Sequence, residues 1–416
     1  MFSVTEASAR IMERIHPLPL ERVALVDALG RVLAKRVVSP LMIPAWDNSA
    51  MDGYAVLASD IAAASAESPV MLDVTETVAA GSFPSGPVER GRAVRIMTGA
   101  PMPDGADTVV RVEDTDDGVS RVLVHSGRDA GRNVRRRGED IREGDVVLEA
   151  GSPLGPAQLG VLASVGAATV DVHRRPRVAF LASGDEIVDL DRFDEALEGK
   201  KIVSSNSYTL RAMIQTAGAE PVSLGIARDD PDDLRERLSR AGEFDLLITS
   251  AGISAGEYDY IRPVLDDLGV TLDVWRVRMR PGAPLGHGWI SEVPWIGLPG
   301  NPVSTMVTFD LFVRPVIRRM LGHDKLFRVP VPVTLDEPVS ISARLTHFLR
   351  AIVRVANDGR LHARLTGAQG SGILSSMARA NALLIVPEER TRSEPNETLN
   401  AFLLGEEAQL STRFSL

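Results

Sequence analysis

The sequence predicts a multidomain protein that combines a doubly wound α/β domain with all-β regions. Candidate strands and helices alternate over residues 174–323, which is typical of a parallel sheet covered on both faces. Short β-rich runs separated by Gly, Pro and Asp turns fill residues 45–142, and a hairpin followed by further strands fills residues 324–416. A chain of 416 residues is long enough for several such domains.

Composition excludes several classes of function. The formal net charge of −10 argues against general nucleic-acid binding. With no cysteine, the chain has no disulfides, no catalytic thiol and no Cys-ligated metal, and its 7 His show no metal-motif spacing. No apolar run reaches the ~18 residues of a membrane span, and the N-terminus lacks a signal-peptide pattern. We expect a soluble, cytoplasmic protein that binds neither nucleic acid nor membrane.

The N-terminal part of the chain predicts helices. Ser3 and Glu6 have the spacing of a capping box, and apolar residues recur at helical spacing over residues 21–34. Another helix is expected after Pro156. We expect residues 1–44 and 143–173 to form one discontinuous domain, into which the β domain of residues 45–142 is inserted.

The expected elements follow simple patterns. In the β domain, the strand candidates are PVMLDVTETV, AVRIMTG, DTVVRVED and VSRVLVHSG. In the α/β domain, the buried strand candidates are RVAFLAS, EPVSLGI, FDLLITS and PWIGL, and each is separated from the next by a helical pattern. In the last domain, RAIVRVANDGRLHARL is a hairpin signal, and ALLIVPEE and TLNAFLL add strands. A small barrel or sandwich is expected there.

Unusual loops follow three strands of the α/β domain, in FLASGDEIV, TSAGISAGEYDY and IGLPGNPVSTM. Ligands of doubly wound sheets lie at the carboxyl ends of the strands, which is the edge that all three loops share. A glycine turn after a strand is common, so each loop alone has an ordinary structural explanation. Three loops on one edge, two of them acidic, favour a ligand site, although neither the GxGxxG nor the P-loop pattern is present.

The residues of these loops predict an anion site with a metal. Glycine-rich backbone and a helix N-terminus both present N–H groups to oxyanions. Asn301 as N-cap and Pro302 at the first helical position fit such a helix start. Mg²⁺ prefers a few carboxylates together with substrate oxygens. The candidates are Gly252, Ser254, Gly256 and Gly300 for the anion, and Asp185, Glu186, Glu257 and Asp259 for the cation.

Basic and acidic residues outside these loops add further candidates. Arg276, Arg278 and Arg280 would share one face if VWRVRMR were a strand, and Arg280 then either faces a ligand or lies on a solvated edge. His287 is expected to be structural. In the β domain, Asp52 and Thr98 lie in polar loops that a turn alone does not readily explain. The charge run VRRRGEDIREGD is expected to be a solvated face.

Together these stretches resemble the molybdopterin molybdenumtransferase family, of the MoeA and gephyrin E-domain type. The matching segments occur in family order and span nearly the whole chain: DNSAMDGYAV, RIMTGAPMPDGADTVV, RRRGEDIREGD, SGDEIV, TSAGISAGEYDY, RPGAPLGHG and GLPGNPVS. The resemblance implies an elongated discontinuous first domain, an inserted β domain, an α/β domain similar to molybdopterin adenylyltransferases and a C-terminal β-barrel. It also implies a homodimer whose active site lies between the α/β domain of one subunit and the β domain of the other.

The resemblance further implies the reaction. Molybdenum from molybdate enters adenylylated molybdopterin, AMP is released with the help of Mg²⁺, and a separate molybdopterin adenylyltransferase is the expected substrate donor. The site residues implied by the matching motifs are Asp52, Thr98, Glu186 and Asp259 for catalysis, Asp229 or Asp230 for the metal, Arg276, Arg280 and Arg350 for the anion, and Ser371 near the substrate. The strand-end loops add Asp185 to the metal candidates and Ser304 to the substrate candidates.

Some positions depart from the family pattern. Arg276 and Arg280 stand where the family often has Lys, Ala283 stands where it has a third Lys, and Ser183 replaces Thr before GDE. Arginine keeps the charge but changes its geometry. Three alternatives therefore stay open at this point: a divergent paralogue or one that uses tungstate, a scaffold or binding protein, and a molybdopterin adenylyltransferase.

Overall fold

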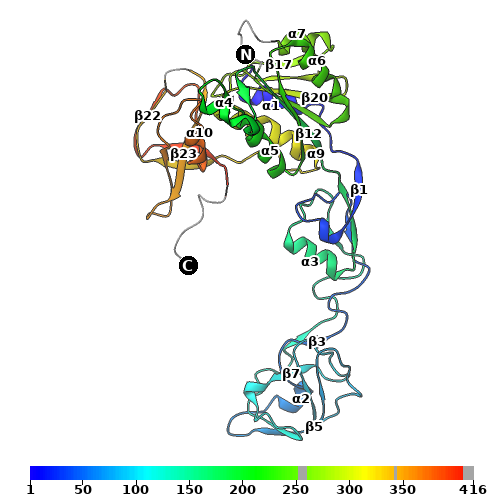
Figure 1. The fold of residues 1–416 in the computed structure, drawn as a ribbon. Helices are drawn as coiled ribbons and strands as arrows, with labels where there is room; N and C mark the ends of the chain where they lie inside the picture. Colours follow the sequence, from blue (N-terminus) through cyan, green and yellow to red (C-terminus); the bar gives the residue numbers. More distant parts are fainter. Residues whose placement is uncertain (252–259, 342–343, 406–416) are drawn as a thin grey trace. The chain divides into compact units, whose positions relative to one another are not determined.

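The computed structural model describes residues 1–251, 260–341 and 344–405 (Figure 1). The chain divides into two compact units. Unit 1 comprises Met1–Ala34, Gly151–Leu154 and Val170–Leu416, and unit 2 comprises Lys35–Ala150 and Gly155–Thr169. The four-domain division made from the sequence stays a prediction. None of the helices in the described residues is both long and apolar enough to cross a membrane.

Unit 1 contains the predicted α/β domain, built on a six-stranded sheet of order β15-β12-β16-β20-β19-β17. The first four strands in this order run parallel, whereas β19 is antiparallel to both of its neighbours. The strands are β12 (Arg177–Ser183), β15 (Glu220–Ala227), β16 (Leu246–Ser250), β17 (Thr271–Trp275), β19 (Gly286–Ile290) and β20 (Val293–Leu298).

Helices cover both faces of this sheet, which confirms the doubly wound fold. Successive residues of β12 point to opposite faces, so Val178 and Phe180 lie in one hydrophobic core and Ala179 and Leu181 in another. The first core includes α1 (Val4–Met12), α5 (Ser205–Thr216), α8 (Pro302–Thr308) and α9 (Arg314–Met320). The second includes α6 (Pro231–Leu238) and α7 (Ile261–Asp267). Figure 1 shows α6 and α7 on one side of the sheet and α5 and α9 on the other.

The capping box predicted at the N-terminus is present. The Ser3 backbone N–H donates to Glu6 Oε2 at 2.7 Å, and the Glu6 N–H donates to Ser3 Oγ at 3.2 Å. These hydrogen bonds from Ser3 hold the pKa of Glu6 below its usual value. Ala7 and Ile11 of the same helix are buried in the core of the α/β sheet.

The helix predicted over residues 21–34 is wrong. The segment forms β1 (Leu20–Ala24) and a 3-10 turn at Leu25–Asp27, and β1 pairs with β11 (Thr169–His173). Val26 is 85% exposed, so the apolar positions do not form a buried face. A short helix needs such a face for stability, whereas the strand gains hydrogen bonds from a segment that is distant in the sequence.

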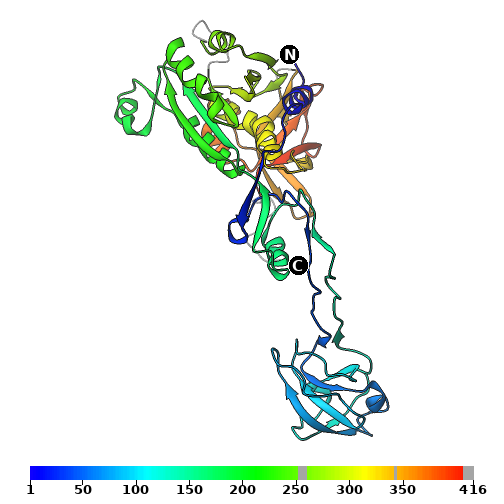
Figure 2. The same cartoon turned by 90° about the vertical axis from the view of Figure 1, so that its right-hand side faces the viewer.

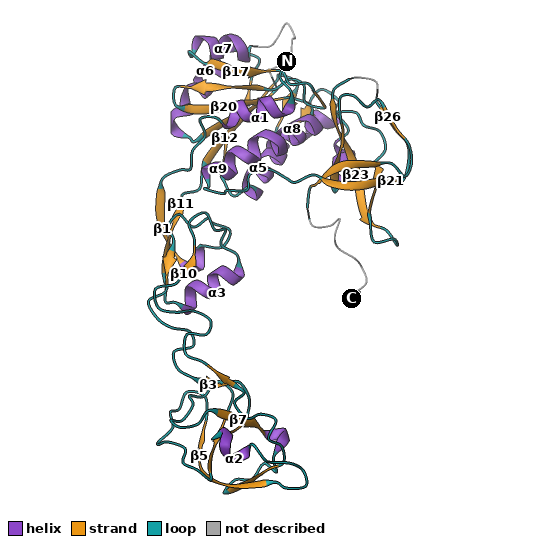
Figure 3. Cartoon of the chain, turned by 180° about the vertical axis from the view of Figure 1, so that it is seen from behind, coloured by secondary structure: helices purple, strands orange, loops and turns teal. Residues whose placement is uncertain are grey.

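The C-terminal part of unit 1 is the predicted β-barrel. Its strands pair in the order β23-β24-β21-β27-β25, and an additional pairing of β23 with β25 closes the sheet. Figure 3 labels β21 and β23 of this domain. Leu349, Ala351 and Val353 of β23 contribute to its core. The predicted hairpin joins β23 to β24, with Gly359 at φ 77° in the turn. The strands are β21 (Val331–Leu335), β23 (Thr346–Val355), β24 (Leu361–Leu365), β25 (Ala382–Val386) and β27 (Thr398–Leu403), and β18 (Met279–Arg280) extends the sheet.

Unit 2 contains the predicted inserted β domain (Figure 2). Its five-stranded sheet has the order β7-β4-β6-β5-β8. Tyr54 and Val56 of β4 lie in one core and Ala55 in the other, so both faces of this strand are buried. The strands are β4 (Gly53–Val56), β5 (Val70–Val78), β6 (Arg92–Ile96), β7 (Thr108–Arg111) and β8 (Arg121–Val124), and the helix predicted after Gly155 is α3 (Pro156–Ser164).

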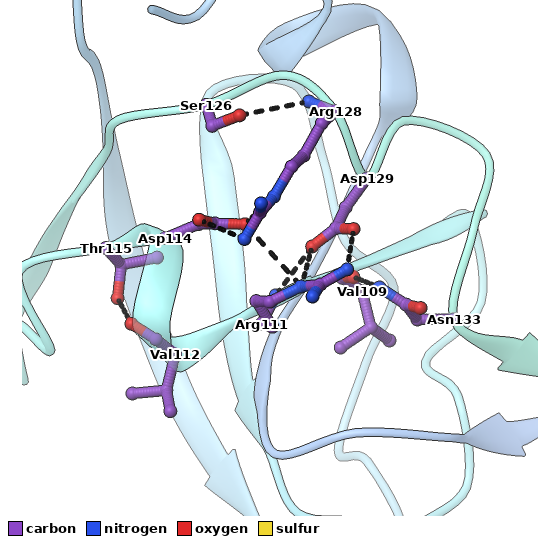
Figure 4. Close-up of polar contacts among 9 residues, drawn as sticks. All are labelled: Val109, Arg111, Val112, Asp114, Thr115, Ser126, Arg128, Asp129 and Asn133. Atoms are coloured by element: carbon purple, nitrogen blue, oxygen red, sulfur yellow. Dashed lines mark hydrogen bonds and ion pairs between the residues drawn. The ribbon is translucent and has the colours of Figure 1, made fainter. Parts of the chain in front are cut away.

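An ion-pair network holds the end of β7 against the loop that follows β8 (Figure 4). The buried carboxylate of Asp129 accepts from Arg111 Nη2 at 2.8 Å and Nε at 3.0 Å. Asp114 contacts Arg128 at 2.6 Å and Arg111 at 3.5 Å. Burial by itself would raise the pKa of Asp129, but the hydrogen bonds from Arg111 and Asn133 outweigh it and lower that pKa.

We expect Asp129→Asn to lower the free energy of unfolding of unit 2 by about 2 kcal/mol, because the buried side chain would lose its charge-assisted hydrogen bonds from Arg111, while Arg111 would keep its contact with Asp114. The lowered pKa sets the pH dependence of this contribution. The stability that Asp129 contributes is fully present above pH ~4, where its carboxylate is ionised in both the folded and the unfolded chain. This stability is lost as the pH falls through the folded-state pKa of Asp129. Urea unfolding of the natural protein and of Asp129→Asn, at pH 7 and at pH 3, measures this difference in stability. Asp73→Asn, in an exposed pair with Arg121, is the control; equal losses in both variants would contradict the prediction.

Candidate functional site

A cavity of about 640 Å³, which we call the main cavity, lies at the carboxyl ends of β12, β16 and β20. This is the edge where the sequence predicted a ligand site. Ser183 and Ser250 line it from the strand ends, Gly300 and Asn301 from the GLPGNPVS loop, and Gly372 from the segment before α10 (Leu374–Ala378). Two segments far apart in the sequence, the α/β domain and a loop next to the barrel, therefore form one cavity.

Asn206, at the start of α5, ties two of these loops together. Its Nδ2 donates to Ser250 Oγ at 2.7 Å and to the carbonyl oxygen of Gly300 at 2.8 Å. Next to this contact, Ala251 has a φ of 84°, which is uncommon for a residue other than glycine. A Cβ at position 300 would lie 3.1 Å from the Cβ of Ala251. Glycine at 300 therefore allows the close approach of the two loops.

The predicted helix start at the third loop is confirmed. Helix α8 begins at Pro302 with Asn301 in the N-cap position, although the Asn301 side chain makes no capping hydrogen bond. Instead, the N–H of Val303 donates to the carbonyl oxygen of Ser371 at 3.1 Å. Ser304 is buried within the helix. The structure thus brings Ser371 to the candidate residues Asn301 and Pro302.

The predicted metal ligands do not all come together. Glu186 lines the main cavity. Asp185 and Asp229, at the ends of β12 and β15, exchange hydrogen bonds: each backbone N–H donates to the other's carboxylate, at 3.2 and 3.3 Å. Asp230 has a structural role as the N-cap of α6, where it accepts from the N–H groups of Asp232 and Asp233.

Within residues 1–251, 260–341 and 344–405, no three or more potential metal-ligating side chains gather in one place. The candidates Gly252, Ser254, Gly256, Glu257 and Asp259 lie outside the described residues.

Residues 276–280 do not form the continuous strand on which Arg276, Arg278 and Arg280 would have shared one face. Strand β17 ends at Trp275, and Arg276 has a φ of 70°, which breaks the extended backbone before β18 begins at Met279. The three arginines therefore do not share a strand face. Arg278 pairs with Glu388 at 3.4 Å, whereas Arg280 lies on β18 opposite His347 of β23.

Arg350 is fully buried, and the described acceptors of its guanidinium are all neutral. Nε donates to Ser376 Oγ at 3.1 Å, and Nη2 donates to the carbonyl oxygens of Gly370 at 2.9 Å and Ala368 at 3.4 Å. Burial lowers the pKa of this guanidinium. A buried charge without a counter-ion is costly, so the surroundings of Arg350 favour an anionic ligand.

Arg350, Arg280 and His347 line a second cavity, of about 260 Å³, which we call the basic cavity. Gln369 also lines it; its Oε1 accepts from the backbone N–H of Arg350 at 2.8 Å. Sequence reasoning named the two arginines and missed His347 and Gln369. The pattern HxxR on a β-strand was the only available signal for His347, and it is too common to be informative.

Unit 2 brings its two candidate residues into contact. Asp52 Oδ1 accepts from both the backbone N–H and the Oγ1 of Thr98, each at 2.7 Å. These hydrogen bonds, first from the Thr98 backbone and then from its side chain, lower the pKa of Asp52. Both residues are exposed. The adjacent Gly53 is required by packing, because a Cβ there would lie 1.9 Å from the carbonyl oxygen of Val110.

Three family models match the chain in succession. They are the MoeA N-terminal region (domain I and II) at residues 2–166, the probable molybdopterin binding domain at residues 179–319, and the MoeA C-terminal region (domain IV) at residues 332–404. The matches cover all three parts of the fold described above, and two of them cover the residues that line the main cavity and the basic cavity.

Curated relatives and solved structures agree with these matches. The chain is 40% identical to the molybdopterin molybdenumtransferase of Nostoc sp., over 88% of this chain and 85% of the relative. It is 32% identical to the molybdopterin molybdenumtransferase of Haemophilus influenzae, over 96% and 98%. The crystal structure of the molybdopterin biosynthesis moeA protein from Pyrococcus horikoshii superposes with a TM-score of 0.83 at 29% identity, covering 97% of this chain and 100% of that one.

Proposed function

Because the chain belongs to the molybdopterin molybdenumtransferase family, we propose that unit 1 binds adenylylated molybdopterin in the main cavity and molybdate in the basic cavity. The protein is a transferase of molybdenum cofactor biosynthesis that inserts molybdenum into molybdopterin. The adenylylated form of the substrate, the release of AMP and the dependence on Mg²⁺ are parts of the proposal.

The observation that carries the molybdate assignment is the buried guanidinium of Arg350. Its described hydrogen bonds all go to neutral oxygens, so the positive charge is not compensated by them. Arginine donors match the oxygens of a tetrahedral oxyanion, and a dianion at this position would offset the charge of Arg350 and of Arg280, which lines the same cavity.

The main cavity suits the larger substrate. Its volume of about 640 Å³ is within the range of small-molecule sites, and its walls combine serine hydroxyls, the Asn301 side chain and loop backbone. Loop backbone and hydroxyl groups can donate to phosphate oxygens. The Asp52–Thr98 pair of unit 2 remains the proposed catalytic contribution of the β domain, since Thr98 holds Asp52 in its ionised form.

The described carboxylates fit an open site for Mg²⁺. Asp185 and Asp229 lie next to each other, and Glu186 lines the cavity, but they do not form a closed protein site. Mg²⁺ is commonly held by one or two carboxylates and by substrate phosphates, so we propose that these residues hold the ion together with substrate. A bound ion would offset the phosphate charge during release of AMP.

The remaining proposals concern assembly and supply. We propose that the protein acts in the cytoplasm as a homodimer and that a molybdopterin adenylyltransferase delivers the adenylylated substrate. These proposals rest on the resemblance of the sequence motifs to those of the family. Light scattering of the purified chain tests the dimer directly, and a monomer at micromolar concentration would rule it out.

AMP release from adenylylated molybdopterin tests the proposed function. We expect release that requires both molybdate and Mg²⁺ and that stops when EDTA is added. Release without molybdate would mean simple hydrolysis of the substrate. No release at all, with the substrate still bound, would indicate a binding protein, whereas formation of adenylylated molybdopterin from ATP would indicate an adenylyltransferase.

A further inference from the structure

His347 has an unusual environment in the basic cavity. Its side chain is 2% exposed, and its buried Nδ1 has no hydrogen-bond partner among the described residues. An imidazole nitrogen normally finds a partner when it is buried, since an unsatisfied polar atom is costly. His347 nevertheless lines a cavity large enough for a small ligand. Nothing in its role as a strand residue of the barrel accounts for this arrangement.

The charged group that acts on His347 is a neighbouring cation. Arg280 is its register partner on β18, whereas Arg350 lies three residues further along β23 and projects from the opposite face of that strand. On the other side, β25 places uncharged Val386 opposite His347, and Glu388, two residues beyond it, is paired with Arg278. Glu337 contacts the cavity wall, where its Oε1 accepts from the backbone N–H of Leu365 at 2.7 Å. The remaining lining side chains carry no charge: Pro281, Ser340, Ile341, Leu349, Leu365 and Gln369. Burial and then the charge of Arg280 lower the pKa of His347.

We propose that His347 takes up a proton when a divalent tetrahedral oxyanion enters the basic cavity and releases it when the anion leaves. The proton comes from solvent and forms the second N–H of the imidazolium, so that no other group changes its protonation state. Without the anion, imidazolium would lie beside the positive charge of Arg280, which favours the neutral ring. With the anion, two negative charges face His347 and Arg280, which are register partners on β23 and β18 and line the cavity together.

This inference deepens the proposed function, because it assigns a pH dependence to the anion cavity. Binding that takes up one proton strengthens as the pH falls, by up to tenfold in Kd per pH unit between the pKa of the free histidine and the higher pKa of the anion-bound histidine. A cavity built from arginines alone would show no such dependence between pH 6 and pH 8.5. His347 is therefore a specificity residue that favours dianions over monoanions.

The test is calorimetric titration of the full chain with sodium molybdate between pH 6 and pH 8.5, in buffers of different ionisation enthalpy. For the natural protein we expect uptake of close to one proton per molybdate near pH 7.5, and a Kd that rises with pH. His347→Gln should bind molybdate with no proton uptake and a flat pH profile. The control is His362→Gln, which changes a barrel histidine paired with Asp336 at 2.8 Å and should keep the natural slope.

Two results would overturn the proposal: the same proton uptake in His347→Gln as in the natural protein, or no proton uptake in either. If His347→Gln fails to fold, NMR of the 7 histidines in the natural chain replaces it, and one imidazole pKa must rise by at least one unit with molybdate. The AMP assay is run in parallel. Molybdate-dependent AMP release without proton uptake defeats this inference alone, whereas proton-linked binding without AMP release defeats only the proposed function.

Discussion

Replacing Arg350 with glutamine should raise the molybdate concentration needed for half-maximal AMP release by about 100-fold. Two charge-assisted hydrogen bonds to an oxyanion contribute roughly 3 kcal/mol, and each 1.4 kcal/mol corresponds to a factor of ten. The charge of Arg350 is buried and its described acceptors are neutral, so removing it leaves no described carboxylate unpaired. The KM for molybdate, measured at saturating adenylylated molybdopterin, gives the result.

Two further variants separate charge from packing. Arg350→Lys keeps the charge but loses the planar guanidinium group with its paired N–H donors, and we expect an intermediate rise of about tenfold in the KM for molybdate. Arg354→Gln removes an arginine of the same strand that forms an exposed pair with Asp336 at 3.1 Å, and we expect no change in this KM. An unchanged molybdate KM in a folded Arg350→Gln protein would remove the anion assignment of the basic cavity.

Replacing Gly53 with alanine should destabilise unit 2 by at least about 3 kcal/mol. The added Cβ would lie 1.9 Å from the carbonyl oxygen of Val110, and backbone in a paired strand cannot move aside without separating β4 from β7. Asp52 precedes this glycine, so the same shift would disturb its hydrogen bonds to Thr98. Urea unfolding followed by limited proteolysis would detect the loss and localise it to unit 2.

Gly160→Ala is the matched control in the same unit. Gly160 is an exposed residue inside α3, and a Cβ there meets no atom within 4 Å. Alanine at a helix interior is favoured over glycine, so we expect a gain of about 0.5–1 kcal/mol in the free energy of unfolding. If Gly53→Ala were as stable as the natural protein, the packing explanation for the glycine of the MDGYA motif would be wrong.

Local chemistry in the sequence determined a large part of the fold. The spacing of Ser3 and Glu6 predicted a capping box, and Asn301 with Pro302 predicted the start of α8, because both depend on neighbouring residues only. The alternation of buried strands and helical patterns predicted the doubly wound sheet, since burial of β12 on both faces requires a continuous apolar run. The sequence Asn357-Asp358-Gly359 between two alternating runs predicted the hairpin turn, because Gly359 readily takes the positive φ of 77° found there.

Tertiary contacts decided the features that local patterns misread or missed. Residues 20–24 form a strand because β11, distant in the sequence, pairs with them, although their apolar spacing fits a helix. Arg276 leaves the extended conformation that would have aligned it with Arg280. Among the described residues, burial leaves the charge of Arg350 with neutral acceptors only and leaves Nδ1 of His347 without a hydrogen-bond partner. Burial and charge compensation depend on which segments pack around a residue, and that packing is a property of the folded chain rather than of any short stretch of it.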